Sequence, residues 1–347
     1  MRIIHIFKNT NEKFSEPYID FVNKNFNEQD HFFYHLGNDI RKVKTSRRNI
    51  EFIERFESLN LIKDMYKAEK IIIHGLFSPL LLVILFFQPW LLKKSYWVAW
   101  GGDLYYYKHR EKSMKSNFYE LIRTFVIRNM RGIITHIKGD YELAKKWYGA
   151  KGKFLFSFMY PSNLYKEYNI SEVKKDSDKK YIQIGNSANL SNNHLEIFKK
   201  LEKYKNDNIE IICPLSYGNI EYRNQVIKEG ERIFGRKFNP LLEFLPFNQY
   251  LELLSKIDIA IFNHDRQQAM GNIITLLGLG KKVYIKNNIT SWDFCLEHGL
   301  TVFSSNKSFD CLYKELDTEK RVRNINNVKE IFSERKLKED LRKIFEE

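Results

Sequence analysis

The chain has 347 residues, of which 43% are hydrophobic and 29% charged; this is enough for two domains with cores of their own and excludes a disordered chain. Its formal net charge of +14 favours a negatively charged partner, such as a nucleic acid, an anionic lipid or a phosphorylated substrate. The three cysteines form no metal-binding pattern and cannot all pair, so we expect a reducing, cytosolic location without a disulfide framework.

The amino-terminal residues predict a strand and no signal peptide, because Met1 leads directly into the strand-like run 2–7. The most apolar run of the chain covers residues 76–92. Pro79 and Pro89 bracket its centre and leave about half of the ~20 residues that a membrane-spanning helix needs. We therefore expect a buried or interfacial helix there and not a transmembrane segment.

The first half of the chain alternates between strand-like and helical patterns, as in a mostly parallel sheet covered by helices. Helical patterns are found, for example, at 50–61 and 118–130. The predicted strands are 3–7, 31–36, 70–74, 96–100, 132–135 and 154–158. We predict a first Rossmann-like α/β domain over residues 1–164.

Polar residues follow two predicted strands of this domain. Gly101 and Gly102 end one strand and expose Asp103 at the carboxyl edge of the sheet, where a carboxylate can accept a proton from a substrate hydroxyl. The alternative is that Asp103 caps the helix that follows. His74 ends the preceding strand in the same way, and His5 lies on the first strand; each is a second choice as catalytic base. A single histidine at such a position can equally be structural.

A basic region extends from Lys93 to Lys146, with twelve Lys or Arg against five Asp or Glu. Tyrosines are interleaved with these charges, and the apolar run 80–87 lies just before them. This composition is typical of a surface that docks on an anionic membrane, where each basic residue contributes about 1 kcal/mol. The alternative is a set of solvated faces around a buried helix.

Residues 165–180 are charged, lack apolar periodicity and predict a linker between domains. They include the DxD sequence 176–178, which lies among lysines and follows no hydrophobic strand, so we expect no metal there. A second Rossmann-like domain follows at 181–320, and a charged, helical tail at 321–347. The strands predicted for the second domain are 181–184, 209–213, 241–245, 257–262, 283–285 and 301–303, and the helices are 194–204, 222–234, 247–255 and 272–279.

The second domain opens with a strand that runs into a glycine turn. Gly185 allows close approach of a ligand to the backbone, and Asn186 and Ser187 follow it with polar side chains. His194 lies at the start of the next helix, behind residues that can cap it. We predict that these four residues face a sugar phosphate, with a simple turn and helix cap as the alternative.

The segment 243–251 joins a predicted strand to a helix one βα unit before the most polar loop of the chain. Its position suits a nucleobase pocket formed by the backbone near Leu245, the ring of Phe247 and the side chain of Tyr250. The two aromatic rings could instead belong to the core.

The most informative loop lies between the strand 257–262 and the helix 272–279. In an open parallel sheet, ligands bind where strands end and helices begin, and the start of a helix favours an anion. Arg266 adds a bidentate phosphate donor, and Gln267 and Gln268 follow it. With Gly271 and Asn272 at the helix start, this loop predicts a diphosphate site, and an ordinary polar loop with a capping role is the alternative.

Three stretches together resemble the 4-acetamido-4,6-dideoxygalactose (Fuc4NAc) transferases, a 4-alpha-L-fucosyltransferase-like family. They are Trp100-Gly101-Gly102-Asp103-Leu104-Tyr105, Ile184-Gly185-Asn186-Ser187 with Ser191-Asn192-Asn193-His194, and Arg266-Gln267-Gln268 with Gly271. The resemblance covers most of both domains. The run Ala269-Met270-Gly271-Asn272 departs from the glycine- and threonine-containing run of the enterobacterial common antigen enzymes, so the donor sugar and acceptor can differ, for example in an O-antigen or capsule pathway.

The resemblance implies an α/β fold of two Rossmann-like domains facing across a cleft, the GT-B glycosyltransferase architecture. It also implies transfer of Fuc4NAc from a dTDP-linked donor to a polyprenyl-diphosphate-linked oligosaccharide. Neither a metal nor another cofactor is expected. Anionic inner-leaflet lipids are the expected membrane partner, and the cytoplasmic face of the bacterial inner membrane is the expected peripheral location.

Two other classes of function remain open from the residues alone. The positive charge would suit a nucleic-acid-binding protein, but the chain has no stacking motif or recognition-helix signature, so no nucleic acid is expected. A non-catalytic scaffold at the membrane is the other alternative. Binding of a nucleoside diphosphate would count against it.

Overall fold

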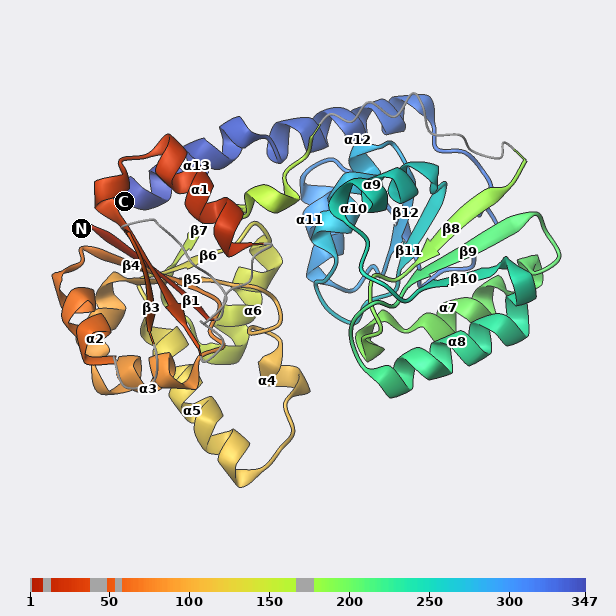
Figure 1. The fold of residues 1–347 in the computed structure, drawn as a ribbon. Coiled ribbons are helices and arrows are strands. Elements are labelled where there is room, and N and C mark those ends of the chain that lie inside the picture. Colours follow the sequence, from red (N-terminus) through yellow and green to blue (C-terminus); the bar gives the residue numbers. More distant parts are fainter. Residues whose placement is uncertain (1, 9–13, 38–48, 54–57, 167–177) are drawn as a thin grey trace. The chain divides into compact units, whose positions relative to one another are not determined.

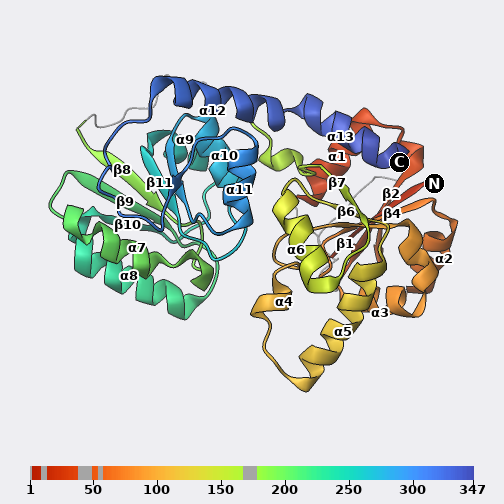
Figure 2. The ribbon, with the colours of Figure 1, turned by 180° about the vertical axis from the view of Figure 1, so that it is seen from behind.

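The computed structural model describes residues 2–8, 14–37, 49–53, 58–166 and 178–347. The chain divides into two compact units: one contains residues 1–164 and 334–347, and the other contains residues 165–333. Each unit is built on one parallel sheet (Figures 1 and 2). The predicted linker falls mostly outside the described residues, as do the first two residues of the DxD sequence 176–178.

The first sheet has the strand order β3-β2-β1-β4-β5-β6-β7. All of its neighbouring strands are parallel. The strands are β1 (Ile3–Lys8), β2 (His31–Leu36), β3 (Ile50–Ile53), β4 (Lys70–His74), β5 (Ser95–Val98), β6 (Gly132–Ile134) and β7 (Lys153–Leu155). Because the strands run in one direction, their carboxyl ends meet at a single edge of the sheet.

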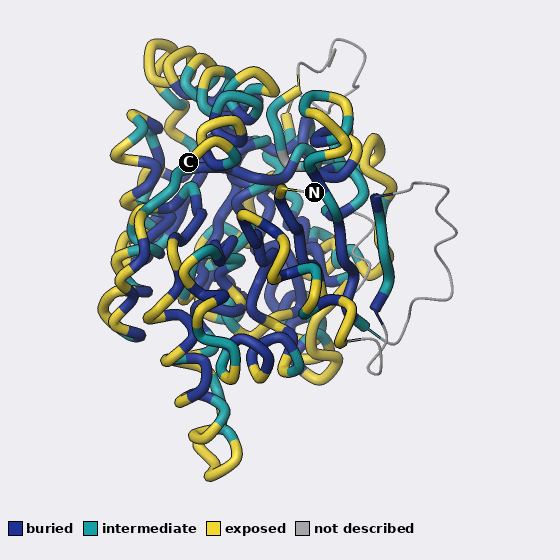
Figure 3. The backbone as a smooth tube through the Cα atoms, turned by 90° about the vertical axis from the view of Figure 1, so that its left-hand side faces the viewer, coloured by how far each residue is buried: buried dark blue, intermediate teal, exposed yellow. Residues whose placement is uncertain are grey.

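Helices cover both faces of this sheet, which is why its strands are buried on both sides (Figure 3). The helix α1 (Ser15–Asn25) packs on one face together with α13 (Glu334–Glu346), which returns from the far end of the chain. The opposite face packs against α2 (Ser58–Lys67), α3 (Pro79–Phe87), α5 (Met114–Asn129) and α6 (Lys138–Tyr148). The short helix α4 (Tyr106–His109) lies just before α5.

The second sheet has the order β10-β9-β8-β11-β12-β13 and is also parallel. Its strands are β8 (Lys180–Ile184), β9 (Ile209–Pro214), β10 (Phe238–Leu241), β11 (Ile259–Phe262), β12 (Lys282–Ile285) and β13 (Phe303–Ser304). The helices are α7 (His194–Leu201), α8 (Ile220–Phe234), α9 (Phe247–Lys256), α10 (Met270–Gly278), α11 (Thr290–Glu297) and α12 (Thr318–Ile331). Helices α7 and α8 cover one face of this sheet, and α9, α10 and α12 lie on the other (Figures 1 and 2).

Two predicted elements are wrong. Residues 50–53 form the edge strand β3 and not the start of a helix, because Ile50–Ile53 pairs with β2 and the ring of Phe52 stacks on His35. The strand predicted at 241–245 lies three residues earlier, at Phe238–Leu241. Pro240 argues against a strand in sequence, but β10 is an edge strand, where a proline is tolerated.

Candidate functional site

The polar residues of the second unit gather at the carboxyl edge of its sheet. The strand β11 ends at Phe262, seven residues of loop follow, and α10 begins at Met270. Ala269 has a left-handed backbone with φ 59°, and no side chain caps the helix. The first N–H groups of α10 have no acceptor within the helix, so this end is suited to hold an anion.

The loop before α10 is joined to the loop after β8 by the side chain of Gln268. Its amide Nε2 donates to Asn186 Oδ1 over 3.0 Å, and its Oε1 accepts from the hydroxyl of Ser191 over 2.7 Å. The Gln268 amide also lies 3.5 Å from Ser187 Oγ. The structure therefore brings together residues predicted from two separate stretches of the sequence.

The guanidinium of Arg266 lies in the same loop, where its Nη1 donates to the carbonyl of Gln267 over 2.9 Å. The side chains of Arg266 and Gln267 are half-buried, and so are Gly271 and Asn272 in the first turn of α10. A cation beside a helix start is the combination that proteins use to bind phosphate groups.

Gly185 is required by its surroundings. Its φ of +67° is left-handed, and a Cβ atom there would overlap Nε2 of His194 and lie 2.7 Å from Oδ1 of Asn192. That Asn192 oxygen accepts hydrogen bonds from the backbone N–H of Asn186 and from Nε2 of His264, both over 3.0 Å. The glycine thus lets a buried asparagine and two histidines pack directly beneath the loop.

His194 supports the loop from below. The Tyr222 hydroxyl accepts from the backbone N–H of His194 over 3.0 Å and lies 3.2 Å from its Nδ1. Burial lowers the pKa of His194 to about 3, so the ring is neutral at physiological pH. The predicted contact of His194 with a donor sugar stays a prediction, and the ring has a packing role against Gly185 and Tyr222.

The predicted nucleobase residues differ in their surroundings. Phe247, the first residue of α9, is exposed, and the Lys166 ammonium lies 5.9 Å from its ring centroid. Leu245 is half-buried. The Tyr250 side chain hydrogen bonds with those of Gln183 and Asn272, and burial raises the pKa of its phenol well above the usual value. Tyr250 therefore reaches the start of α10, whereas Phe247 faces outward.

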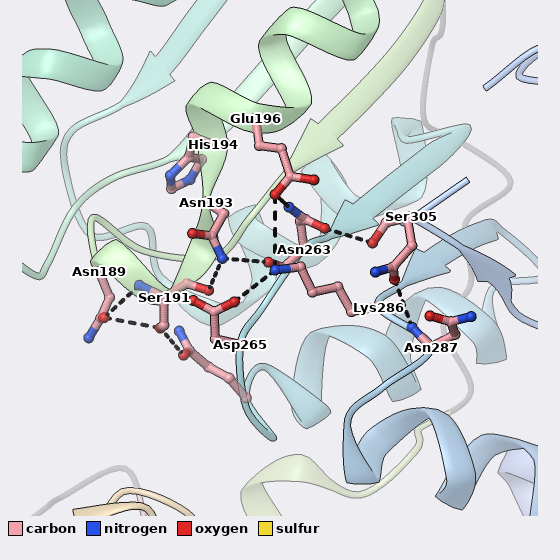
Figure 4. Close-up of polar contacts among 12 residues, drawn as sticks. Asn189, Ser191, Asn193, His194, Glu196, Asn263, Asp265, Lys286, Asn287 and Ser305 are labelled. Carbon is pink, nitrogen blue, oxygen red and sulfur yellow. Dashed lines mark hydrogen bonds and ion pairs between the residues drawn. The ribbon is translucent and has the colours of Figure 1, made fainter. Parts of the chain in front are cut away.

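A second polar cluster, which no sequence motif indicated, lies beside the first at the same edge. Lys286, directly after β12, pairs with Asp265 at 2.7 Å and lies 4.0 Å from Glu196. Asn263 donates to Glu196 over 2.8 Å and accepts from the hydroxyl of Ser305 over 2.8 Å (Figure 4). These contacts join the loops after β11, β12 and β13 to α7 and hold the loop that carries Arg266.

No sequence motif indicated Tyr217 either. Its hydroxyl accepts from Nδ2 of Asn186 over 2.9 Å, and it lies in the loop after β9. The signal that could have found Tyr217 and Lys286 is position alone, because each follows a predicted strand and therefore lies at the carboxyl edge.

In the first unit, Asp103 is an anchor for two loops. Its Oδ2 accepts from the backbone N–H of Leu76 over 2.8 Å and from the indole of Trp97 over 2.7 Å. Its Oδ1 accepts from the N–H groups of Trp100 and Leu104, both over 2.9 Å. The side chain is 1% exposed. Four donors enclose the carboxylate, and this geometry favours an anchoring role over the proton transfer predicted from sequence.

His74 lines a cavity of about 300 Å³ at the carboxyl edge of the first sheet. The other lining residues are Phe7, Lys8, Phe14, Ser15, Phe77 and Trp100. Nδ1 of His74 lies 3.0 Å from the Tyr160 hydroxyl and Nε2 lies 3.4 Å from Nδ1 of His5. Burial lowers the pKa of His74 well below its usual value, so it is a neutral imidazole.

Within the described ranges, no three His, Cys, Asp or Glu side chains are grouped so that they could hold a metal ion. The predicted metal-independent reaction stays a prediction.

Three solved structures share the fold along almost the whole chain. The Anabaena protein HepE, in complex with UDP and glucose, has a TM-score of 0.68 at 11% identity and covers 100% of this chain and 99% of its own. A glycosyltransferase from Rickettsia africae has a TM-score of 0.67 at 14% identity and covers 99% and 97%. The UDP-forming alpha,alpha-trehalose-phosphate synthase from Burkholderia vietnamiensis has a TM-score of 0.65 at 9% identity and covers 100% of both chains.

At these identities the likeness establishes the fold, which is the GT-B architecture of two Rossmann-like domains. The sequence model of one family, described as 4-alpha-L-fucosyltransferase, glycosyl transferase group 56, matches residues 6–340. The chain therefore belongs to the 4-alpha-L-fucosyltransferase family of glycosyl transferase group 56 and is a glycosyltransferase.

Proposed function

We propose that this glycosyltransferase moves a Fuc4NAc-like acetamidodeoxyhexose from a dTDP-linked donor to a polyprenyl-diphosphate-linked oligosaccharide in cell-surface polysaccharide synthesis. The observation that carries the proposal is the loop of Arg266 and Gln268 at the uncapped start of α10, tied to Asn186 of the neighbouring loop. The family supports a fucose-like sugar, and the motifs shared with the Fuc4NAc transferases support its acetamido substituent.

The proposed chemistry is direct displacement at the anomeric carbon, with the diphosphate as the leaving group. Arg266 and the first N–H groups of α10 would stabilise the charge that develops on the diphosphate, and Gly271 presents no side chain to obstruct it. Fixed donors placed where charge develops can contribute several kcal/mol without a metal ion. Gln267 and Gln268 would contact the diphosphate or the sugar.

The nucleobase would lie against the segment from Leu245 to Tyr250. Tyr250 already contacts Asn272 at the helix start, so a base held there would lie close to the start of α10. The likeness to HepE, whose structures contain UDP and UDP-glucose, supports a nucleoside diphosphate in the second unit. The choice of dTDP rests on the resemblance to the Fuc4NAc transferases.

The first unit carries an exposed apolar stripe that suits a lipid surface. Met114, Phe118 and Leu121 on α5 are 91%, 66% and 68% exposed, and Phe125 continues the stripe at 38%. Their spacing of four, three and four residues places them on one side of the helix. The amino-terminal turns of α5 project from the rest of the unit (Figure 1), and its start is exposed (Figure 3).

Contacts extend this stripe to α3, because the ring of Phe125 packs on Phe86 at a centroid distance of 5.2 Å. Val83 and Phe87 of α3 are exposed, whereas the other face of the helix is buried. Three exposed lysines, at positions 108, 112 and 115, lie just before the stripe or within its first turn. An apolar face with lysines beside it fits peripheral docking on anionic lipid of the cytoplasmic leaflet.

No helix in the described part of the chain combines the length and hydropathy needed to cross a bilayer. The apolar run predicted as a buried or interfacial helix is α3, which covers nine residues.

The test of the donor site is nucleotide binding by Arg266→Ala. The wild-type chain should bind dTDP and dTDP-sugars, seen as a rise in melting temperature, and Arg266→Ala should lose most of that rise. Arg236→Ala, which removes an exposed arginine of the same unit, is the matched control and should behave as wild type. Turnover should fall on the order of 10²-fold in Arg266→Ala. Equal dTDP affinity in the two variants would rule out the proposed site.

A further inference from the structure

Three histidines form a continuous buried chain across adjacent strands of the first sheet. His5 on β1 lies between His74 on β4 and His31 on β2. Nδ1 of His5 is 3.4 Å from Nε2 of His74, and Nε2 of His5 is 3.0 Å from Nδ1 of His31. All three rings are buried.

The direction of its hydrogen bonds follows from Trp100, whose indole can only donate. The indole donates to the Tyr160 hydroxyl over 2.6 Å, and the single hydrogen of that hydroxyl then points to Nδ1 of His74 at 3.0 Å. His74 must therefore carry its hydrogen on Nε2 and direct it at His5. By the same reasoning His5 directs its Nε2 hydrogen at Nδ1 of His31.

The two ends of the chain have different surroundings. Trp100 and His74 line the cavity at the carboxyl edge, so this end meets whatever binds there. At the other end, Asp30 acts to raise and Arg2 to lower the pKa of His31, which burial brings to about 4. Asp30 therefore favours the charged form of His31, the ring at this end of the chain.

Three further titratable groups face the chain. The Tyr18 hydroxyl on α1 lies 3.3 Å from Nδ1 of His5 and shares that acceptor with His74. His35 lies near His74 and disfavours a charge on it. Asp103 lies close enough to Tyr160 to raise the pKa of its phenol, together with burial, which contributes most.

We propose that this chain carries the proton of the acceptor hydroxyl from the cavity to His31; the inference rests on the proposed function. As the acceptor oxygen bonds to the anomeric carbon, its hydrogen passes to the Tyr160 oxygen and the Tyr160 hydrogen passes to Nδ1 of His74. The Nε2 hydrogen of His74 moves to Nδ1 of His5, and the Nε2 hydrogen of His5 moves to Nδ1 of His31. The electron pair of the broken sugar–phosphate bond leaves with the nucleotide diphosphate.

The net change is one proton moved from the acceptor to His31, which becomes an imidazolium beside Asp30. Tyr160 is the catalytic residue in this scheme: its hydroxyl contacts Trp100 and His74, which both line the cavity, and it would be the group that meets the acceptor. His74, His5 and His31 are positioning residues that act through it. The relay supplies the base that Asp103, enclosed by four donors, does not offer.

The test is His5→Gln, assayed with dTDP-Fuc4NAc and a polyprenyl-diphosphate-linked disaccharide. Glutamine can still donate and accept hydrogen bonds, but it cannot take a proton on one atom and release one from another. We expect kcat to fall on the order of 10²-fold, with the KM for the acceptor and the dTDP-induced thermal shift unchanged. His109→Gln, on the exposed side of the same unit, is the control and should retain the wild-type kcat.

A second measurement on the wild-type chain does not depend on how a variant folds. The rate in mixtures of H₂O and D₂O should curve with the deuterium fraction, because several hydrogens move together. A straight line, or full kcat in His5→Gln, would overturn the relay while leaving the transferase in place. If the wild-type chain makes no product from these substrates, the proposed function falls and the relay falls with it.

Discussion

Replacing Gly185 with alanine tests whether the loop after β8 depends on the packing beneath it. The matched control is Gly149→Ala, because Gly149 also has a left-handed backbone, with φ +64° and ψ 31°, and its added Cβ would make only ordinary contacts, at 3.8 and 3.9 Å, with the side chain of Arg128. Both variants bear the cost of an alanine in that conformation, about 1 kcal/mol. Any further loss in Gly185→Ala therefore measures the packing alone.

The size of that further loss follows from Asn192. Its Oδ1 accepts from the N–H of Asn186 and from Nε2 of His264, and the new methyl would lie 2.7 Å from this oxygen. Displacing the oxygen leaves two buried donors unsatisfied, at about 1–3 kcal/mol each. Gly185→Ala should thus lose about 2–6 kcal/mol more than Gly149→Ala.

Urea unfolding followed by circular dichroism measures the loss, and the thermal shift with dTDP measures its effect on the site. The dTDP shift should shrink in Gly185→Ala, because the displaced Asn186 no longer holds Gln268. Equal unfolding midpoints for the two alanine variants would refute the reasoning, since only the methyl group at position 185 overlaps its neighbours.

Three other predictions concern pH, the membrane surface and the first unit. Burial lowers the pKa values of His194 and His264 to about 3, so both rings stay neutral in the folded protein. In the unfolded chain they take up protons below about pH 6.5, so the folded state loses stability relative to the unfolded state as the pH falls. Urea unfolding of the second unit should be easier by about 4 kcal/mol at pH 5 than at pH 7, and equal stability would contradict this. Phe118→Glu should reduce sedimentation with phosphatidylglycerol vesicles, whereas Ile220→Glu, an exposed site on the other unit, should not; the same loss in both would exclude α5 as the docking element. Asp103→Asn should lower the melting temperature by several degrees, because an amide nitrogen would face N–H donors; an unchanged melting temperature with lost transfer would return Asp103 to the role of base.

The sequence predicts the fold because its strand and helix patterns alternate along both halves of the chain. The predicted loop of Arg266 and the predicted turn of Gly185 come together for a general reason: in a parallel sheet all strands end at one edge. The contact of Gln268 with Asn186 is the direct consequence. No motif was needed to place these residues near one another, only the order of strands and helices.

What the sequence could not predict depends on contacts between distant residues. The sequence predicts His194 as a hydrogen-bond donor to a ligand at the start of a helix. Its ring is instead buried, because Gly185 has no side chain to exclude it. Lys286 and Tyr217 follow strands and belong to no motif, so only the assembled edge reveals their partners Asp265 and Asn186. The role of each of these residues is determined by its contacts with residues from neighbouring strands and loops.

Asp103 and His74 show why position at a sheet edge is not sufficient to assign a base. Both residues end neighbouring strands, so sequence reasoning ranks them together. The loops then fold so that each oxygen of Asp103 accepts hydrogen bonds from N–H groups. These hydrogen bonds hold Leu76 and Trp100 in place. His74 instead has a hydrogen-bond partner on each nitrogen that can itself exchange a hydrogen. A carboxylate saturated by four N–H donors has no free lone pair for a substrate. An imidazole in a chain of exchangeable partners can pass a proton on, and this difference directs the search for the base to the histidines.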